Sequence, residues 1–412
     1  MKIALTGLLA LVCLSTSAQT QVQTKAQTTL QPPEIAASAY FLVDVTASQV
    51  LAAKNEDAPV EPASLTKLMS AYLVFDALKT KKIDLKQAFP VSEKAWKMPG
   101  SRMFIDPKMH VPVEDLIKGM IVQSGNDATM ALAEGVGGTA ERFVQMMNDQ
   151  AKALGMKGTS YKNPEGLTAS GHVTTARDLS ILARRLMSDF PEYIRFYSIK
   201  KYRYTGTPEA NDSNRNLLLF RDPSVDGLKT GYTEAAGYCM VATANRQFPN
   251  LAPSFTPNAA GSSGVVGNTA ASGGRRLLSI VLGTVNENAR ANESQKLLNW
   301  GYTAYQAVKL FDANQAVSTA TVWKGKTSSV KLGQFQQAIV VAVPSGNVGK
   351  LKTEVIRTEP LIAPITRGQQ VGILKTSIGN EVLVEVPLVA LDGVEQTGIL
   401  GRAWDAVRLW IR

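Results

Sequence analysis

The chain has 412 residues, of which 45% are hydrophobic and 19% are charged, so it can bury a sizeable core and is not a disordered chain. Its formal net charge of +10 is compatible with nucleic acid, an anionic membrane, an acidic polymer or solubility alone. Because the sequence has no basic tract with interleaved aromatic residues, we expect no nucleic-acid partner.

Residues 1–18 predict a signal peptide. Lys2 provides a basic end, an apolar stretch continues through Leu14, and small residues follow up to Ala18. The apolar stretch is too short to span a bilayer, and no later run approaches the ~20 apolar residues of a spanning helix. We therefore expect an exported, periplasmic protein. Cys239 is then the only cysteine of the mature chain, so no intrachain disulfide is expected.

The next segments predict a leader, a hairpin and a group of helices. Residues 19–35 are rich in Gln and Thr and are typical of a disordered leader. Residues 39–53 alternate in the manner of a β-hairpin. Apolar residues at helical spacing then predict helices over residues 65–78, 113–122, 128–134, 140–154 and 176–188.

Strands return later in the chain. Two short apolar runs, residues 237–244 and 276–283, predict neighbouring antiparallel strands. Between them, residues 247–274 are rich in Gly, Ser, Asn, Pro and Ala and indicate a long, mobile insertion that faces solvent. A final helix is predicted over residues 292–308, and we place the first domain at residues 36–309.

After Leu310 the sequence pattern changes to short β-rich runs broken by Gly, Pro and Asn. This pattern predicts a small all-β domain over residues 310–396. The predicted strands are residues 317–323, 337–343, 351–356, 370–374 and 382–386.

Residues 397–412 predict an amphipathic helix. Leu400, Trp404 and Val407 share one helical stripe, whereas arginines occupy the other side. A basic amphipathic helix with tryptophans at a free end favours a position in a membrane interface. The alternative is a terminal helix docked on the β domain.

Ser64 and Lys67 form a Ser-x-x-Lys tetrad at the start of the helix predicted over residues 65–78. Residues three apart on a helix share a face, so the amine can reach the hydroxyl and take its proton. Because Pro62 precedes the tetrad, we expect Ser64 at the helix N-terminus, where backbone N–H groups and the helix dipole favour a developing anion.

Two later motifs indicate that the tetrad belongs to a catalytic site. Ser124 and Asn126 can relay a proton towards a leaving group and hold a substrate amide. The run Lys229-Thr230-Gly231 predicts an edge strand whose glycine leaves room for a bound peptide. Burial and a second cation can lower the pKa of Lys67, and Lys229 is the candidate cation. Together the motifs predict a serine acyl-transfer site.

The series Ser-x-x-Lys, Ser-x-Asn and Lys-Thr-Gly resembles that of penicillin-binding proteins and serine β-lactamases. The longer strings at residues 61–69, 124–128 and 226–233 are similar to those of the D-alanyl-D-alanine carboxypeptidases. The likeness runs from about Ala36 to the C-terminus. It implies an α/β (α+β) penicillin-binding/β-lactamase-like domain with a helical subdomain and an antiparallel sheet, followed by the small all-β domain and the amphipathic helix.

The resemblance implies a role for each motif. Ser64 matches the acylated nucleophile and Lys67 its base, while Ser124 and Asn126 match the second motif of the catalytic site. The substrate's terminal carboxylate would be received by the third motif, Lys229-Thr230-Gly231.

The resemblance also implies further substrate-binding positions. The oxyanion would lie between the backbone N–H of Ser64 and that of Tyr232. Arg215 and Arg290 match positions that favour a carboxylate. Tyr232 stands where His or Thr is more usual, and the 247–274 insertion is longer than usual, so either feature could tune peptide access.

The activity implied is a serine DD-carboxypeptidase without cofactors, which removes the terminal D-alanine of peptidoglycan stem pentapeptides through an acyl-enzyme on Ser64. It would also bind β-lactams covalently, and it would lie peripherally at the outer face of the cytoplasmic membrane. A β-lactamase is one alternative, favoured by fast penicillin turnover without release of D-alanine. A non-catalytic wall-binding protein is the other, favoured if Ser64→Ala leaves the cellular effect intact.

Other residues are interpreted as structural. Glu165 invites comparison with the deacylating Glu of class A β-lactamases, but its neighbours fit a structural turn. His110 and His172 lack companions at ligand spacing, so no metal site is expected. Cys239 is interpreted as a small buried apolar residue.

Overall fold

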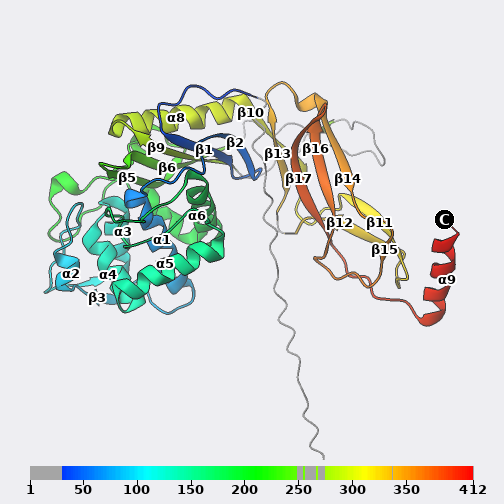
Figure 1. The fold of residues 1–412 in the computed structure, drawn as a ribbon, viewed down its shortest axis with the longest axis horizontal. Helices are drawn as coiled ribbons and strands as arrows, with labels where there is room; N and C mark the ends of the chain where they lie inside the picture. The colour runs from blue at the N-terminus through cyan, green and yellow to red at the C-terminus, as the bar shows by residue number, and fades with distance from the viewer. Residues whose placement is uncertain (1–29, 248–253, 256–265, 268–273, 336, 412) are drawn as a thin grey trace, which may run out of the picture.

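The computed structural model describes residues 30–247, 254–255, 266–267, 274–335 and 337–411. Figure 1 shows a first part that combines a sheet with helices, a second part made of strands, and helix α9 (Ile399–Trp410) at the end remote from the first part. The predicted signal peptide lies outside the described residues. So does most of the predicted insertion, of which the described pieces, β7 (Ser254–Phe255) and β8 (Val266–Gly267), pair antiparallel.

The first part is built on a five-stranded antiparallel sheet of order β2-β1-β9-β6-β5. Alternate residues of its strands enter two different apolar clusters, since Phe41 joins one and Leu42 the other. The predicted hairpin and the predicted pair of antiparallel strands are both confirmed. The five strands are β1 (Ala39–Asp44), β2 (Gln49–Lys54), β5 (Val225–Thr233), β6 (Gly237–Gln247) and β9 (Gly274–Thr284).

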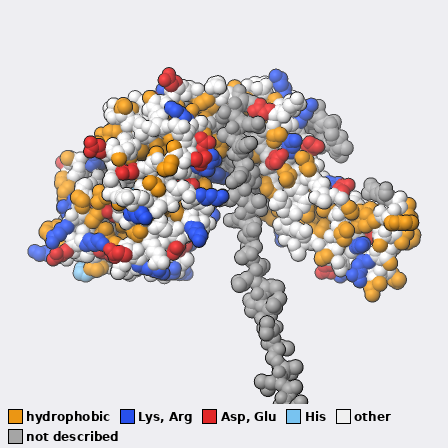
Figure 2. All heavy atoms as spheres, viewed as in Figure 1, with side chains coloured by type: hydrophobic (Ala, Val, Ile, Leu, Met, Phe, Trp, Pro, Cys, Tyr) orange, Lys and Arg blue, Asp and Glu red, His pale blue; other side chains and the backbone are white. Residues whose placement is uncertain are grey.

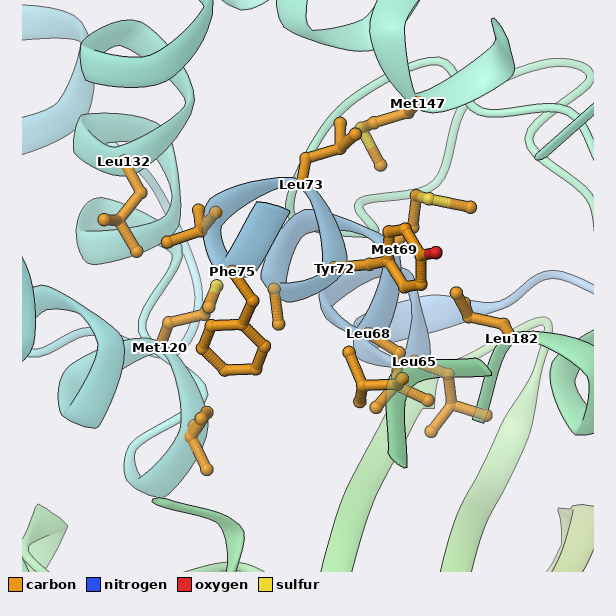
Figure 3. Close-up of a cluster of buried hydrophobic side chains, with 14 of the residues drawn as sticks. Leu65, Leu68, Met69, Tyr72, Leu73, Phe75, Met120, Leu132, Met147 and Leu182 are labelled. Carbon is orange, nitrogen blue, oxygen red and sulfur yellow. The ribbon is translucent and has the colours of Figure 1, made fainter. Parts of the chain in front are cut away.

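The helices of the first part pack around α1, of whose residues all but two are buried. In Figure 3, Leu68, Tyr72 and Phe75 of α1 point in different directions, and each meets apolar side chains of the surrounding core. A helix that is apolar all round belongs inside a core, so α1 is the rigid centre of this part.

The helices predicted from apolar spacing are confirmed, with small shifts at their ends. The α-helices are α1 (Lys67–Lys79), α2 (Glu93–Trp96), α3 (Val113–Val122), α4 (Asn126–Gly137), α5 (Ala140–Leu154), α6 (Ala176–Asp189), α7 (Leu218–Arg221) and α8 (Glu287–Ala304). Short elements between them are η1 (Ala63–Thr66), β3 (Ala88–Pro90), β4 (His110–Pro112), η2 (Pro191–Ser198) and η3 (Glu209–Asn211).

The last predicted helix of this part, residues 292–308, has different bounds. It starts earlier because Asn286 caps α8 by accepting a hydrogen bond from the backbone N–H of Ala289 at 2.8 Å. It ends at Ala304 because the chain then forms β10 (Tyr305–Phe311), which pairs with β13 (Ile339–Pro344). Residues 305–309, expected in the first domain, thus pair with a strand of the second part.

The second part has a core of its own, formed by its strands. Its six-stranded sheet has the order β14-β16-β17-β12-β11-β15 and lies beside the β10–β13 pair. The predicted β-rich runs are confirmed as strands. The elements are β11 (Ser318–Trp323), β12 (Ser329–Gly333), η4 (Val348–Lys350), β14 (Leu351–Ile356), β15 (Leu361–Ile362), β16 (Gln370–Ile378) and β17 (Glu381–Ala390).

The two parts are joined by buried contacts. The side chain of Gln49 donates to the backbone oxygen of Ala342 at 3.2 Å and accepts from its N–H at 2.6 Å. Ile35, expected in the disordered leader, is buried and packs in the same cluster as Ala342. Burial of the apolar Ile35 side chain is favourable, which explains why this end of the predicted leader is ordered.

Helix α9 buries none of its side chains. Its polar side meets the end of β11, where Asp405 accepts from the backbone N–H of Lys324 at 2.7 Å and Arg408 lies over the Trp323 ring at 5.5 Å. Figure 2 shows hydrophobic side chains gathered at this end of the molecule. None of the described helices is long and apolar enough to cross a membrane.

Candidate active site

Ser64 and Lys67 lie where η1 passes into α1. Ser64 is partly exposed, whereas Lys67 is fully buried by the packing around α1. The Nζ atom of Lys67 lies 3.0 Å from the Oγ atom of Ser64. The predicted contact between amine and hydroxyl is therefore present. Ser64 lies in the 3₁₀ helix η1 that precedes α1, and not at the first turn of the α-helix itself.

Lys67 has two other partners from distant parts of the chain. It donates to Asn126 Oδ1 at 2.7 Å and to the backbone oxygen of Glu165 at 2.6 Å. Burial lowers the pKa of Lys67 to about 7, while the negative charges of Glu165 and Asp127 oppose this shift. Burial, one of the two causes that we expected, is thus the main cause of its low pKa.

The second motif lies between α3 and α4. Asn126 begins α4 and also donates from Nδ2 to the backbone oxygen of Pro99 at 2.7 Å. Ser124 has a positive φ of 59°, a conformation uncommon for residues other than glycine. Its Oγ atom is buried without a hydrogen-bond partner among the residues that the structure describes. Ser124 therefore lies close to Asn126 in the chain but is not bonded to Lys67.

Asp127 was not predicted as part of the site, although it lies directly after the second motif. Its buried carboxylate accepts backbone N–H groups of Met103, Phe104 and Ala128 at 2.8, 2.8 and 2.9 Å. Charge-assisted bonds of this kind are strong, so Asp127 ties the segment around residues 99–105 to the start of α4. The sequence gives no local signal for this contact, because the partners lie more than 20 residues away.

The third motif is on β5, which is an edge strand as predicted. Lys229 is buried, and its Nζ donates to the backbone oxygen of Thr230 at 2.9 Å. Burial, followed by repulsion from Lys67, Arg290 and Arg215, lowers the pKa of Lys229 well below its ordinary value. Lys229 is thus close enough to Lys67 for their charges to interact.

Gly231 also has a packing role that was not predicted. A Cβ atom at this position would lie 3.2 Å from Ala63 Cβ and 3.3 Å from the backbone nitrogen of Leu65. Such distances are tight for any Cβ atom, so the missing side chain allows β5 to approach η1 closely. The room for a bound peptide along the free edge of β5 stays a prediction.

The two arginines differ in their surroundings. Arg290 is buried on α8 and donates to the backbone oxygens of Gly231 and Arg215, each at 3.3 Å, and to Glu287 at 2.6 Å. It therefore holds β5 and the Arg215 segment together. The side chain of Arg215 is exposed, and its positive charge contributes to the lowered pKa of Lys229.

Tyr232 continues β5 beyond the third motif and is 52% exposed. Its ring lies 4.3 Å from that of Tyr238 on the paired strand β6, centroid to centroid. The pair forms an aromatic surface at the end of the motif strand, and such surfaces suit contact with apolar or ring-shaped groups.

A turn at residues 163–167 completes the site. Asn163 Oδ1 accepts the N–H groups of Gly166 and Leu167 at 2.7 and 3.1 Å, and Ser70 donates to the backbone oxygen of Pro164 at 2.6 Å. These bonds fix the backbone oxygen of Glu165 on Lys67. This turn was interpreted as structural. Its own sequence does not indicate the contact with Lys67, because the two residues lie 98 positions apart.

His172 is 1% exposed and lies behind η1. Its Nδ1 accepts the backbone N–H of Lys162 at 2.9 Å, so Nε2 carries the proton and donates to Thr66 Oγ1 at 2.8 Å. Burial lowers the pKa of His172 from 6.5 to about 4. Within the described ranges, no three His, Cys, Asp or Glu side chains gather closely enough to hold a metal ion.

The lowered pKa of His172 predicts that the free energy of unfolding decreases in acid. The unfolded chain takes up this proton near pH 6.5 and the folded chain near pH 4, so the contribution is complete above pH 6.5 and falls as the pH drops to 4. In urea unfolding at pH 7.5 and 4.5, we expect the wild type to lose about 2–3 kcal/mol more than His172→Gln. Equal losses in the two proteins would contradict this assignment.

The arrangement around Lys67 is suited to proton transfer. A neutral amine has two N–H groups and one lone pair. With Asn126 and Glu165 accepting the two N–H groups, the lone pair remains for the hydroxyl proton of Ser64. A serine next to such a base can attack a carbonyl carbon and form an acyl-enzyme.

Comparison with known proteins agrees with this chemistry. Residues 26–252 match the family model described as D-alanyl-D-alanine carboxypeptidase. Residues 305–396 match the model of the penicillin-binding protein 5 C-terminal domain.

Individual relatives cover nearly the whole chain. The D-alanyl-D-alanine carboxypeptidase DacC of Escherichia coli is 37% identical, over 93% of this chain and 90% of its own. DacA of Haemophilus influenzae is 34% identical, over 92% and 91%. The crystal structure of penicillin-binding protein 5 from Haemophilus influenzae has a TM-score of 0.77 and 34% identity, covering 89% of this chain and all of that one.

The fold and the comparisons define a serine peptidase with a penicillin-binding protein fold, which is a hydrolase. The chain belongs to the D-alanyl-D-alanine carboxypeptidase family. The predicted fold class and enzyme class are thereby confirmed.

Proposed function

We propose that Ser64 removes the terminal D-alanine from peptidoglycan stem peptides through an acyl-enzyme. Lys67 takes the hydroxyl proton as Ser64 Oγ attacks the carbonyl carbon between the last two D-alanines. The D-alanine amine leaves with a proton, and water then hydrolyses the ester on Ser64. The observation that carries this proposal is the 3.0 Å contact between Ser64 and a buried, readily deprotonated Lys67.

The remaining motif residues bind and orient the substrate in this proposal. Lys229 and Thr230 receive the terminal carboxylate, helped by the field of Arg215 and Arg290. The backbone N–H groups of Ser64 and Tyr232 hold the oxyanion, which is the effect with the largest catalytic contribution in acyl transfer. Asn126 holds both Lys67 and the substrate amide, and Ser124 carries the proton towards the leaving amine.

The acyl-enzyme can be tested with a β-lactam, whose ring carbonyl replaces the peptide carbonyl. After incubation with ampicillin and digestion with trypsin, we expect the added mass on the fragment of residues 55–67, which contains Ser64. Ser64→Ala should carry no adduct because the bond-forming oxygen is absent. An adduct elsewhere, or none on the wild type, would exclude the proposal.

The two rival functions give different results in parallel assays. D-Alanine release from a defined pentapeptide distinguishes a carboxypeptidase from a β-lactamase, which would turn penicillin over rapidly and release no D-alanine. A wall-binding protein without catalysis would do neither. The buried base beside Ser64 favours the carboxypeptidase, because a lysine costs free energy to bury and is of use there mainly as a proton acceptor.

We further infer that the enzyme is exported and that α9 lies in the interface of the cytoplasmic membrane, on its outer face. The apolar side chains of α9 support this inference, since Leu400, Trp404 and Trp410 are 88%, 65% and 88% exposed. Docking on the β domain uses the polar residues Asp405 and Arg408 and leaves the apolar side open. Such a helix suits the boundary between headgroups and acyl chains.

Vesicle binding tests the role of α9. In co-sedimentation with vesicles that contain anionic lipids, Leu400→Glu combined with Trp404→Glu should reduce binding at least about tenfold, because two buried apolar groups are lost. The control Val285→Glu changes an apolar residue of the first part that is 83% exposed, and it should bind as the wild type does. Equal binding by all three proteins would contradict the inference.

A further inference from the structure

Glu165 has a buried carboxyl group with no assigned role. Its side chain is 4% exposed, and its Oε2 atom has no hydrogen-bond partner among the described residues. A buried carboxyl oxygen without a partner is costly, by about 1–3 kcal/mol or more. A turn needed only for its backbone would be served by an apolar side chain at this position.

The backbone of Glu165 is fixed against the proposed catalytic base. Its carbonyl oxygen lies 2.6 Å from Lys67 Nζ, and the turn around it is held by Asn163 and Ser70. Gly166, the next residue, fits against Ala63 with no room for a side chain. These contacts hold the backbone of Glu165 at a fixed distance from Lys67, and the charge of its carboxyl group acts on Lys67.

Two carboxyl groups act on the charge of Lys67, and they differ in their partners. Asp127 on α4 is bonded to several backbone N–H groups, so its charge is engaged in holding the chain. The Glu165 carboxyl group is supported by its own backbone N–H group, and the cations that act on it are Lys67 and, more weakly, Lys94 of α2. The charge of Lys229 on β5 also interacts with that of Lys67.

We propose that the Glu165 carboxyl group acts through Lys67, stabilising the ammonium ion that forms when Lys67 accepts the Ser64 proton, and so sets the pH range of acylation. The inference rests on the proposed function. Glu165 is a positioning residue in this scheme, because it acts on the base and not on the substrate. Burial raises the pKa of Glu165, and the charge of Lys67 opposes that shift.

The consequence of removing the charge follows from electrostatics. Glu165→Gln keeps the shape of the side chain but removes the attraction that favours protonated Lys67, so the pKa of Lys67 falls further. The neutral amine is then present at lower pH, and it is a weaker base. We therefore expect the acid limb of acylation to move down by roughly one pH unit and the plateau rate to fall about tenfold.

The experiment measures the acylation rate constant of the full-length protein with a fluorescent penicillin between pH 5 and 9. The variants are Glu165→Gln, Glu165→Asp and the control Glu61→Gln. Glu61 also lies near the site, where it is bonded to Thr168 and Thr233. The carboxyl groups that act on Lys67 are those of Glu165 and Asp127, so the Glu61 variant should keep the wild-type acid limb. Glu165→Asp retains a charge at a greater distance and should move the limb by a few tenths of a pH unit.

The outcomes separate this inference from the proposed function. If the wild type takes no penicillin on Ser64, the proposed function fails. If the wild type is acylated and Glu165→Gln has the same acid limb, only the inference about Glu165 is overturned. Circular dichroism checks folding, and if Glu165→Gln does not fold, an unchanged acid limb in Glu165→Asp overturns the inference in its place.

Discussion

Lys67→Ala is expected to lower the acylation rate constant by a factor of about 10³ or more, because a positioned general base contributes roughly 10²–10⁴. The variant removes the group that lies 3.0 Å from Ser64 Oγ, and no other described side chain bonds to that hydroxyl in the structure. The measurement is the rate of labelling by a fluorescent penicillin, together with D-alanine release from a pentapeptide.

The control for this variant is Lys152→Ala, which removes an exposed lysine of α5. It should be acylated at the wild-type rate, which excludes a general effect of lost positive charge. Thermal unfolding checks that Lys67→Ala is folded, since the loss of Lys67 leaves Asn126 Oδ1 and the Glu165 oxygen without their donor. Acylation of Lys67→Ala within tenfold of the wild type would exclude Lys67 as the base.

Gly166→Ala is expected to lower the free energy of unfolding by about 3 kcal/mol or more and to slow acylation at least about tenfold. A Cβ atom at this position would lie 1.8 Å from the backbone oxygen of Ala63, and the φ angle is +91°. The contact joins Gly166 to a backbone atom of Ala63, so the clash cannot be relieved by a side-chain rotation. Moving either segment would displace Ser64 or the backbone oxygen of Glu165. Urea unfolding and penicillin labelling measure the two effects.

Gly138→Ala is the matched control because it separates backbone strain from the clash. Gly138 has a φ of +78°, but nothing lies within 4 Å of the position of its Cβ atom. It should therefore lose only about 1–2 kcal/mol for its positive φ and keep the wild-type rate of acylation. If both variants lose the same stability, the contact between Gly166 and Ala63 is not responsible.

Much of the fold could be predicted because it depends on local spacing. The helices around α1 and the paired strands of both parts carry apolar residues at periods that neighbouring residues already define. The end of α8 was predicted wrongly because the sequence of residues 305–308 is compatible with both a helix and a strand. Their pairing with β13, more than 30 residues later, decided in favour of a strand.

The contact between Ser64 and Lys67 follows from local sequence, because a spacing of three residues along one helical turn brings the two groups together wherever the turn lies. The surroundings of that pair depend instead on how distant segments pack. The partners of Lys67 come from positions 59 and 98 residues away, and its pKa depends on the burial of α1 by the whole core. Burial and distant contacts follow from packing, which no local spacing of residues encodes.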